Sequence, residues 1–185
     1  ALSNEQKSNG VLAISSGNHA QGVAYAAKAF GVKAVIVMPK DAPKLKIENT
    51  KSLGAKVVLY DRLIENREAL GLKISNDNKL TQIKPYDEPL VIAGQGTCGL
   101  EIATQSKQLN IVDSDVIVCC GGGGLTSGIA LALEQEAPKL KVRTAEPLNF
   151  NDVALSLKNG KIMQNSSLTG SICDAILTPK PGTLT

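Results

Sequence analysis

One stretch of the chain decides the fold, and it reads Val116-Ile117-Val118-Cys119-Cys120-Gly121-Gly122-Gly123-Gly124. An apolar run ends in four consecutive glycines, and a segment with helical periodicity follows over 125–137. Glycines carry no Cβ atom, so the backbone can turn tightly and present successive N–H groups to an anion. The helix adds the positive end of its dipole at the same point. The stretch therefore predicts a strand, a phosphate-binding turn and a helix, with a plain tight turn as the alternative.

Strand-like and helix-like segments alternate along the rest of the chain. Apolar runs predict strands at 11–14, 32–38, 56–60, 114–120 and 140–146. Helical periodicity predicts helices at 19–30, 43–54, 62–75, 97–109, 125–137 and 151–158. Asp41 is the expected cap of the second of these helices, which enters through Pro43. This alternation is typical of the α/β class, with a parallel sheet flanked by helices.

Two turn-rich segments, at 76–78 and 84–89, interrupt the alternation. We place a domain junction at the second of them, so two α/β lobes are expected. The first lobe is a small domain over 1–88, and residues 1–7 read as an N-terminal helix that is already under way at the first residue. The second lobe, over 89–185, is part of a larger domain.

The composition narrows the class of protein. Hydrophobic residues make up 43% of the chain and aromatic residues only 3%, so the core depends on aliphatic side chains, which suit parallel strands buried on both faces. The net charge of +3 is spread along the chain without interleaved aromatics, which argues against nucleic-acid binding. No apolar run is long enough to span a membrane. The cysteines show no zinc-ligand spacing, so we expect reduced thiols in the cytoplasm; they are Cys98, Cys119, Cys120 and Cys173.

The glycine stretch fits neither common nucleotide motif. A P-loop requires Lys-Ser/Thr after the glycines, where Leu125-Thr126 stands. A Rossmann fingerprint requires a further glycine, and Thr126 or Ser127 occupies the required position. A cofactor with a single phosphate monoester is therefore favoured over a nucleotide.

A second polar constellation, Ser15-Ser16-Gly17-Asn18-His19, also stands between a strand and a helix. Hydroxyls, an amide and a helix N-terminus can together bind a substrate carboxylate. The alternative is simple capping of the helix by Asn18 or Ser16. His19 is the only histidine, and its place in the first turn favours a structural role.

These motifs carry a family resemblance that covers nearly the whole chain. The run from Ser15 to Ala24 resembles the signature of pyridoxal-phosphate-dependent serine/threonine dehydratases and serine racemases. Further similar motifs follow in the same order along the chain: Val37-Met38-Pro39, Ala42-Pro43-Lys44, Pro85-Tyr86-Asp87-Glu88-Pro89, Val91-Ile92-Ala93-Gly94-Gln95-Gly96-Thr97, Gly121-Gly122-Gly123-Gly124-Leu125, Ala145-Glu146-Pro147 and Ser171-Ile172-Cys173-Asp174-Ala175.

The resemblance implies a fold-type II enzyme similar to the tryptophan synthase β subunit, with the second lobe as part of the cofactor-binding domain. It implies that pyridoxal 5′-phosphate is held at its phosphate by Gly121, Gly122, Gly123, Gly124 and Leu125, and at its 3′-oxygen by Asn18. The substrate carboxylate would lie among Ser15, Ser16, Gly17, Asn18 and His19. Ser16 matches a catalytic acid/base of the racemases. The resemblance also implies a homodimer and a Mg²⁺ or Ca²⁺ site made by Glu146, the Phe150 carbonyl and Asp152. For the two carboxylates, an exposed strand end and a helix cap are the alternative.

The implied reaction converts L-threonine to 2-oxobutanoate, or L-serine to pyruvate, with release of ammonia. The family's Schiff-base lysine stands in a Ser-Phe/Tyr-Lys context, and no lysine of this sequence follows Phe or Tyr. The family also places a Ser, Thr or Cys opposite the pyridine nitrogen in a later glycine-rich segment. We therefore expect a chain truncated at both ends. A serine racemase, a nucleotide-binding α/β protein and an inactive fragment are the alternatives.

Overall fold

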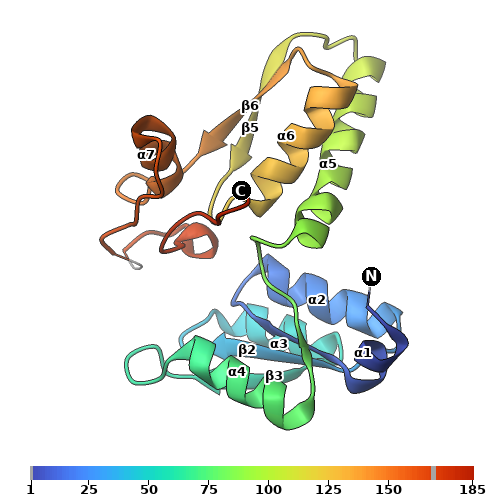
Figure 1. Ribbon diagram of the computed structural model, residues 1–185, viewed down its shortest axis with the longest axis vertical. Coiled ribbons are helices and arrows are strands. Elements are labelled where there is room, and N and C mark those ends of the chain that lie inside the picture. Colours follow the sequence, from blue (N-terminus) through green and yellow to red (C-terminus); the bar gives the residue numbers. More distant parts are fainter. Residues whose placement is uncertain (1, 168–169) are drawn as a thin grey trace. The chain divides into compact units, whose positions relative to one another are not determined.

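The computed structural model describes residues 2–167 and 170–185 and divides into two compact units, Ala1–Pro85 and Tyr86–Thr185 (Figure 1). Each unit contains parallel strands packed against helices. The predicted α/β class with parallel sheets is therefore confirmed. Among the described residues, no helix is both long enough and apolar enough to cross a membrane.

The first unit is built on a four-stranded parallel sheet with the strand order β3-β2-β1-β4. Its strands are β1 (Val11–Ile14), β2 (Ala34–Pro39), β3 (Lys56–Tyr60) and β4 (Thr81–Gln82). Its helices are α1 (Asn4–Asn9), α2 (Asn18–Ala29), α3 (Lys44–Ser52) and α4 (Arg67–Asn78). The expected strands over 11–14 and 56–60 match β1 and β3 as the structure has them.

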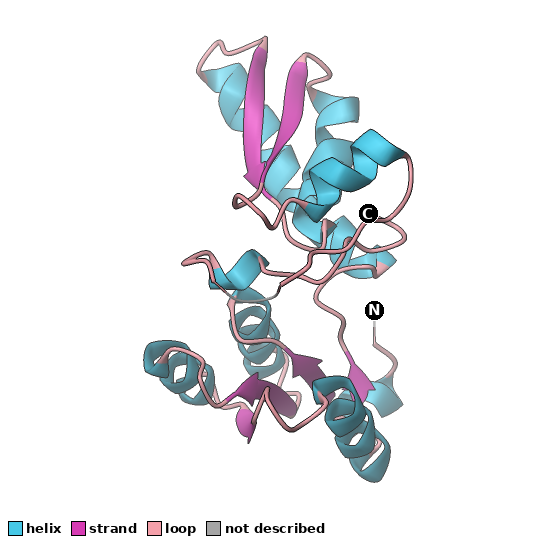
Figure 2. Cartoon of the chain, turned by 90° about the vertical axis from the view of Figure 1, so that its left-hand side faces the viewer, coloured by secondary structure: helices cyan, strands magenta, loops and turns pink. Residues whose placement is uncertain are grey.

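Helices cover both faces of this sheet (Figure 2). Val11 and Ala13 of β1 point to the face that packs against α2 and α3. Leu12 and Ile14 point to the opposite face, against α4. Successive residues of a strand alternate between faces, so a strand that is buried on both sides must be apolar throughout.

The second unit has a two-stranded parallel sheet, β5 (Ser114–Cys119) with β6 (Leu140–Ala145). Its helices are α5 (Pro89–Gln108), α6 (Gly124–Glu136) and α7 (Asp152–Asn159), with a short 3-10 turn η1 (Asp174–Ile176). One face of the sheet packs on α6, through Val118, Ile129 and Leu133. The apolar residues of β5 and β6 that face this core alternate with exposed ones, as expected for a sheet covered on one side.

The helices α5 and α6 lie side by side and meet through glycines (Figure 1). A Cβ atom at Gly99 would lie 2.7 Å from the Ala132 Cβ and 2.9 Å from the Ile129 carbonyl oxygen. A Cβ atom at Gly128 would lie 2.4 Å from the Ile92 carbonyl oxygen. These separations are too short for real contacts, so the two backbones approach as closely as they do only because these positions lack side chains.

Two expected helix starts are wrong. The helix expected from residue 62 begins at Arg67, because the Asn66 side chain caps it by accepting from the Glu68 and Ala69 amides at 3.0 Å each. The helix expected over 97–109 begins eight residues earlier, at Pro89, whose missing N–H costs nothing in a first turn. The turn expected at 76–78 is instead the last turn of α4, which Lys79 ends in the left-handed conformation.

Two expected helix caps also differ. Asp41 does not cap α3, whose N-cap is Pro43; its carboxylate accepts from Arg62 Nε at 2.8 Å instead. The N-terminal helix does not include Leu2 and Ser3 but begins at Asn4, where Ser3 forms a capping box with Gln6. Ala1, which we expected in this helix, lies outside the described residues.

His19 ties the start of α2 to the segment that follows β4. Its ring Nε2 lies 3.0 Å from the Ile83 carbonyl oxygen, which can only accept, so Nε2 carries the proton in this contact. Burial lowers the pKa of His19 below its ordinary value of 6.5, and the bond to Ile83 opposes that shift in smaller measure. The structural role expected for this residue is thus consistent with its contacts.

His19 should make stability depend on pH. Because its pKa is lower in the folded chain, the unfolded chain takes up a proton first as the pH falls. The stabilisation is therefore complete above about pH 6.5 and is lost as the pH falls from there through the folded pKa. The urea midpoint should drop between pH 7.5 and 5.5 more in the wild type than in His19→Gln, which keeps a donor for Ile83. An equal drop in both proteins would contradict this assignment, since no other histidine is present.

The glycine contact between α5 and α6 gives a second prediction. Gly99→Ala should lower the free energy of unfolding by about 1–3 kcal/mol, because its methyl group would overlap backbone and side-chain atoms of α6. Gly94→Ala, in the same helix but facing open space, should raise it by up to about 1 kcal/mol through helix propensity. Urea unfolding followed by circular dichroism measures both. Similar effects of the two substitutions would show that the helices do not touch at Gly99.

Candidate functional site

The four glycines form the turn between β5 and α6. Gly123 has φ of 96°, in the left-handed region that only glycine adopts freely, and it is the N-cap of α6. Its carbonyl accepts from the Ser127 amide at 2.8 Å. No side chain caps this helix, and its first turn contains no acidic residue. The first amides of α6 are therefore left for an anion from outside the chain.

The glycine loop is shaped by close contacts within its own unit. A Cβ atom at Gly122 would lie 2.2 Å from the Tyr86 ring, and one at Gly123 would lie 2.6 Å from the Thr185 side chain. Neither position can therefore accept even alanine without a shift of its neighbours. This close approach separates the loop from a plain tight turn, which needs fewer glycines.

The last residues of the chain are bonded to the same loop. The Gly122 carbonyl accepts from Thr185 Oγ1 at 2.7 Å and from the Gly182 amide at 3.1 Å. Asp87 Oδ1 accepts from the Leu184 amide at 2.8 Å. Tyr86 thus packs against the loop, and Asp87 binds the terminal segment that is bonded to it.

A buried hydroxyl lies in the first turn of α6. Thr126 Oγ1 is buried. It lies beside the thiol of Cys120, whose pKa is raised by burial and lowered in smaller measure by this hydroxyl. Helix amides without a side-chain cap, next to a hydroxyl group, suit a phosphate ester, so this loop fits the phosphate of pyridoxal phosphate.

The segment Ser15-Ser16-Gly17-Asn18-His19, called the serine loop here, leads from β1 into α2 in the first unit. The Ser15 amide donates to the Val37 carbonyl at 3.1 Å, and Ser15 Oγ accepts from the Gly17 amide at 3.3 Å. The N-cap of α2 is Gly17, which has no side chain to donate or accept. Capping by Asn18 or Ser16, the alternative drawn from the sequence, is therefore wrong. The open N-terminus of α2 is instead available to a carboxylate.

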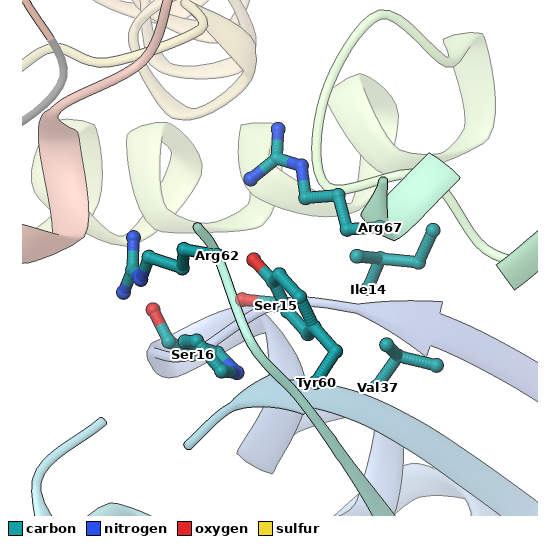
Figure 3. Close-up of a pocket in the computed structure, with 8 residues that line it drawn as sticks. Ile14, Ser15, Ser16, Val37, Tyr60, Arg62 and Arg67 are labelled. Carbon is teal, nitrogen blue, oxygen red and sulfur yellow. The ribbon is translucent and has the colours of Figure 1, made fainter. Parts of the chain in front are cut away.

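A shallow polar pocket adjoins the serine loop (Figure 3). It is a small hollow, open to solvent, with room for about one water molecule. Its lining comes from the carboxyl ends of β1, β2 and β3 and from the start of α4, and consists of Ile14, Ser15, Ser16, Val37, Pro39, Tyr60, Arg62 and Arg67. Sequence reasoning missed Tyr60 and the two arginines. The available signal was their place at or after the carboxyl end of a predicted strand, since ligands of α/β proteins bind at that edge of the sheet.

Glu146 and Asp152 meet at the start of α7. The Glu146 carboxylate accepts from the Val153 and Ala154 amides, each at 2.9 Å, and so caps the helix. Asp152 is only 1% exposed, and its Oδ1 accepts from Asn165 Nδ2 at 2.6 Å. Burial, the largest effect, raises the pKa of Asp152, while the bond from Asn165 opposes the shift.

Two observations at these residues bear on the expected cation site, one in favour of it and one against it. Asp152 Oδ2 is buried without a hydrogen-bonding partner among the described residues, as a ligand oxygen awaiting a cation would be. Nowhere in residues 2–167 and 170–185 do three or more His, Cys, Asp or Glu side chains gather as a metal site. A cation here would therefore depend on two carboxylates and the carbonyl of the buried Phe150.

The known proteins to which this chain is similar include two ammonia-lyases. The chain is 40% identical over 184 residues to the L-threonine ammonia-lyase of Thermotoga maritima, covering 100% of this chain and 45% of that protein. It is 44% identical over 162 residues to the L-threo-3-hydroxyaspartate ammonia-lyase of Saccharomyces cerevisiae, covering 88% of this chain and 48% of that protein. The chain spans about half the length of these curated relatives.

Solved structures agree with this placement. Maize serine racemase superposes with a TM-score of 0.89 at 39% sequence identity, over 100% of this chain and 54% of that one. The family model described as pyridoxal-phosphate dependent enzyme matches residues 1–185. The glycine loop with its open helix end, the fold and these matches agree, and the chain belongs to the family of pyridoxal-phosphate dependent enzymes.

Proposed function

We propose that this protein is a pyridoxal-phosphate-dependent ammonia-lyase that converts L-threonine to 2-oxobutanoate and L-serine to pyruvate. The observation that carries the proposal is the glycine loop, which opens an uncapped helix where a side chain would not fit. The 40% identity to an L-threonine ammonia-lyase extends over the entire chain and supports the choice of reaction. Both named relatives release ammonia from a 3-hydroxy amino acid, which favours elimination as the common chemistry.

Each motif has a separate part in this proposal. Bound pyridoxal phosphate supplies an electron-withdrawing ring that stabilises negative charge at the substrate Cα. Gly121, Gly122, Gly123, Gly124 and Leu125 hold its phosphate through backbone amides and the dipole of α6. Asn18 donates to the ring oxygen of the cofactor, and the first turn of α2 holds the substrate carboxylate among Ser15, Ser16, Gly17, Asn18 and His19. Ser16 moves a proton at Cα as acid or base.

The arrangement of the whole protein is part of the proposal. Residues 1–88 act as the small domain, and 89–185 contribute to the larger cofactor-binding domain. The enzyme works in the cytoplasm as a homodimer on a small amino acid, without nucleic acid or membrane as a partner.

We propose further that Mg²⁺ or Ca²⁺ binds at Glu146, the Phe150 carbonyl and Asp152. The buried and unpartnered Oδ2 of Asp152 supports this, because a lone buried carboxylate oxygen is costly without a partner. Glu146 would keep its bonds to the α7 amides while a remaining lone pair of each oxygen faces the cation.

Two other functions compete with the lyase. Serine racemase has the same cofactor and nearly the same motifs, and it is represented among the structural neighbours. A nucleotide-binding protein would use Glu146, at the end of β6, to hold a ribose. That carboxylate accepts from two helix amides instead, which weighs against this alternative.

The lyase proposal predicts a specific pair of results. Pyridoxal phosphate should raise the melting temperature more than pyridoxal, which lacks the phosphate that the glycine loop binds. A form of the protein that includes the family's Schiff-base lysine should, with pyridoxal phosphate and L-threonine, release 2-oxobutanoate, measured as its hydrazone, with an equal amount of ammonia. D-serine without pyruvate after incubation with L-serine would favour the racemase instead. Stabilisation by NAD or ATP, with pyridoxal phosphate inert, would contradict both.

The cation proposal predicts opposite effects of one substitution. Without divalent cations, Asp152→Asn should raise the melting temperature, because it removes a buried charge while keeping an acceptor for Asn165. Mg²⁺ or Ca²⁺ should stabilise the wild type but not this variant. Asp115→Asn, which alters an exposed carboxylate of the same unit, should respond to cations as the wild type does. Equal stabilisation of Asp152→Asn by the cations would rule out the site.

A further inference from the structure

The segment 182–185 lies against the glycine loop and bonds to one of its peptide groups. The Gly122 carbonyl accepts from Thr185 Oγ1 at 2.7 Å and from the Gly182 amide at 3.1 Å. Figure 1 shows the end of the chain beside the start of α6. A Cβ atom at Gly123 would lie 2.6 Å from Thr185 Oγ1, so the threonine also packs against the next residue of the loop. These contacts therefore act on the peptide group that joins Gly122 to Gly123.

The orientation of this peptide group decides what the loop presents to an anion. No peptide bond of the described chain is cis, and the C=O and N–H of a planar trans peptide point in opposite directions. Since the Gly122 carbonyl points to the segment 182–185, the Gly123 N–H points away from it. A peptide group turned by 180° would put a carbonyl oxygen where the N–H now lies, and that oxygen would repel an anion.

The backbone alone does not favour the observed orientation. Gly123 has φ of 96° and ψ of −10°. These angles are close to the values of about 80° and 0° at the third residue of a type II turn. Turning the peptide group would change φ of Gly123 to about −84°, close to its value in the commoner type I turn. Glycine adopts both conformations readily, so the two hydrogen bonds to the Gly122 carbonyl favour one orientation where the backbone does not.

A carboxylate holds the bonded segment in place. Asp87 Oδ1 accepts from the Leu184 amide at 2.8 Å, and both carboxylate oxygens of Asp87 lie 3.2 Å from Thr183 Oγ1. A Cβ atom at Gly182 would lie 2.7 Å from Asp87 Oδ1, so glycine is needed where the segment passes the carboxylate. The bonded residues directly precede Thr185 in the chain, and they therefore restrict where its hydroxyl can lie.

We propose that Thr185 is a positioning residue for the cofactor phosphate. Its hydroxyl and the Gly182 amide hold the Gly122 carbonyl away from the anion, so that the Gly123 N–H is oriented as a donor before the phosphate binds. Asp87 acts through the segment that carries Thr185. A donor that is oriented in advance binds without the entropy cost of ordering it. The inference rests on the proposed binding of pyridoxal phosphate at the glycine loop and names the residues that keep the loop ready.

Pyridoxine 5′-phosphate and pyridoxine test this role, because neither has an aldehyde that could react with the lysines of the chain. The ratio of their dissociation constants, from melting-temperature shifts, measures what the phosphate contributes to binding. Pyridoxine 5′-phosphate should bind the wild type at least about tenfold more tightly than pyridoxine. Thr185→Val, which has nearly the same shape but no donor, should reduce this ratio about fivefold or more, and Thr185→Ser should retain it. As a control, Thr104→Val removes a hydroxyl that donates to the Leu100 carbonyl on α5, and the ratio should stay unchanged.

Two further measurements follow the proposed donor and its support. The amide proton of Gly123 should shift downfield in the NMR spectrum when pyridoxine 5′-phosphate binds the wild type, and this shift should be lost in Thr185→Val. Asp87→Ala should reduce the ratio by the same route. The double variant should therefore lose no more than the larger of the two single losses. Additive losses would contradict the role given to Asp87.

Three results would overturn the role of Thr185. They are a wild-type ratio in Thr185→Val, an equal weakening of both ligands by that substitution, and a ratio as low in Thr185→Ser as in Thr185→Val. The first would leave phosphate binding at the glycine loop intact and remove only this inference. A wild type that binds pyridoxine 5′-phosphate no better than pyridoxine would contradict the phosphate site itself, and the inference would fall with it.

Discussion

The close approach of backbone to backbone at a few glycines is the constraint on which the second unit depends. Gly99 and Gly128 let α5 and α6 touch along their lengths, and this fixes where α6 begins. Gly122 then passes directly under the Tyr86 ring, so the loop before α6 can take only one course. Packing that admits no methyl group holds the loop rigid, and a rigid loop presents its amides without further loss of entropy when an anion binds.

The helix N-termini of this protein differ in how their first amides are satisfied. The starts of α1, α4 and α7 are satisfied by Ser3, Asn66 and Glu146. The starts of α3 and α5 carry prolines, which remove a donor. Only α2 and α6, within the described chain, have a glycine as N-cap, and neither has an acidic residue in its first turn. A side-chain cap would stabilise each by about 1 kcal/mol, and without one the first amides of both helices have no side-chain partner at the N-cap.

Much of the fold could be predicted from the sequence because buried parallel strands are apolar throughout and are easy to recognise. The predicted helix starts were wrong where two local sequence signals competed. Asn66 outweighed Arg62 as a helix start, and Pro89 was read as a turn although it suits a first helical turn. The strand β4 has only two residues and is held by its bonds to β1, so its own sequence carries no periodicity.

A candidate site could be predicted from the sequence where its residues are consecutive in the chain. The serine and glycine loops are such segments, and the open helix ends found at both are consistent with the roles expected of them. The polar pocket beside the serine loop was not predictable, because Tyr60, Arg62 and Arg67 come close to Ser15 only through the order of three strands in the sheet. The serine loop and Arg62, which both line this pocket, differ in their surroundings. The serine loop, proposed to bind the carboxylate common to all amino acids, follows directly from a strand of the sheet. Arg62 instead lies in an exposed connection, in which the side chains of Leu63 and Ile64 are almost fully exposed.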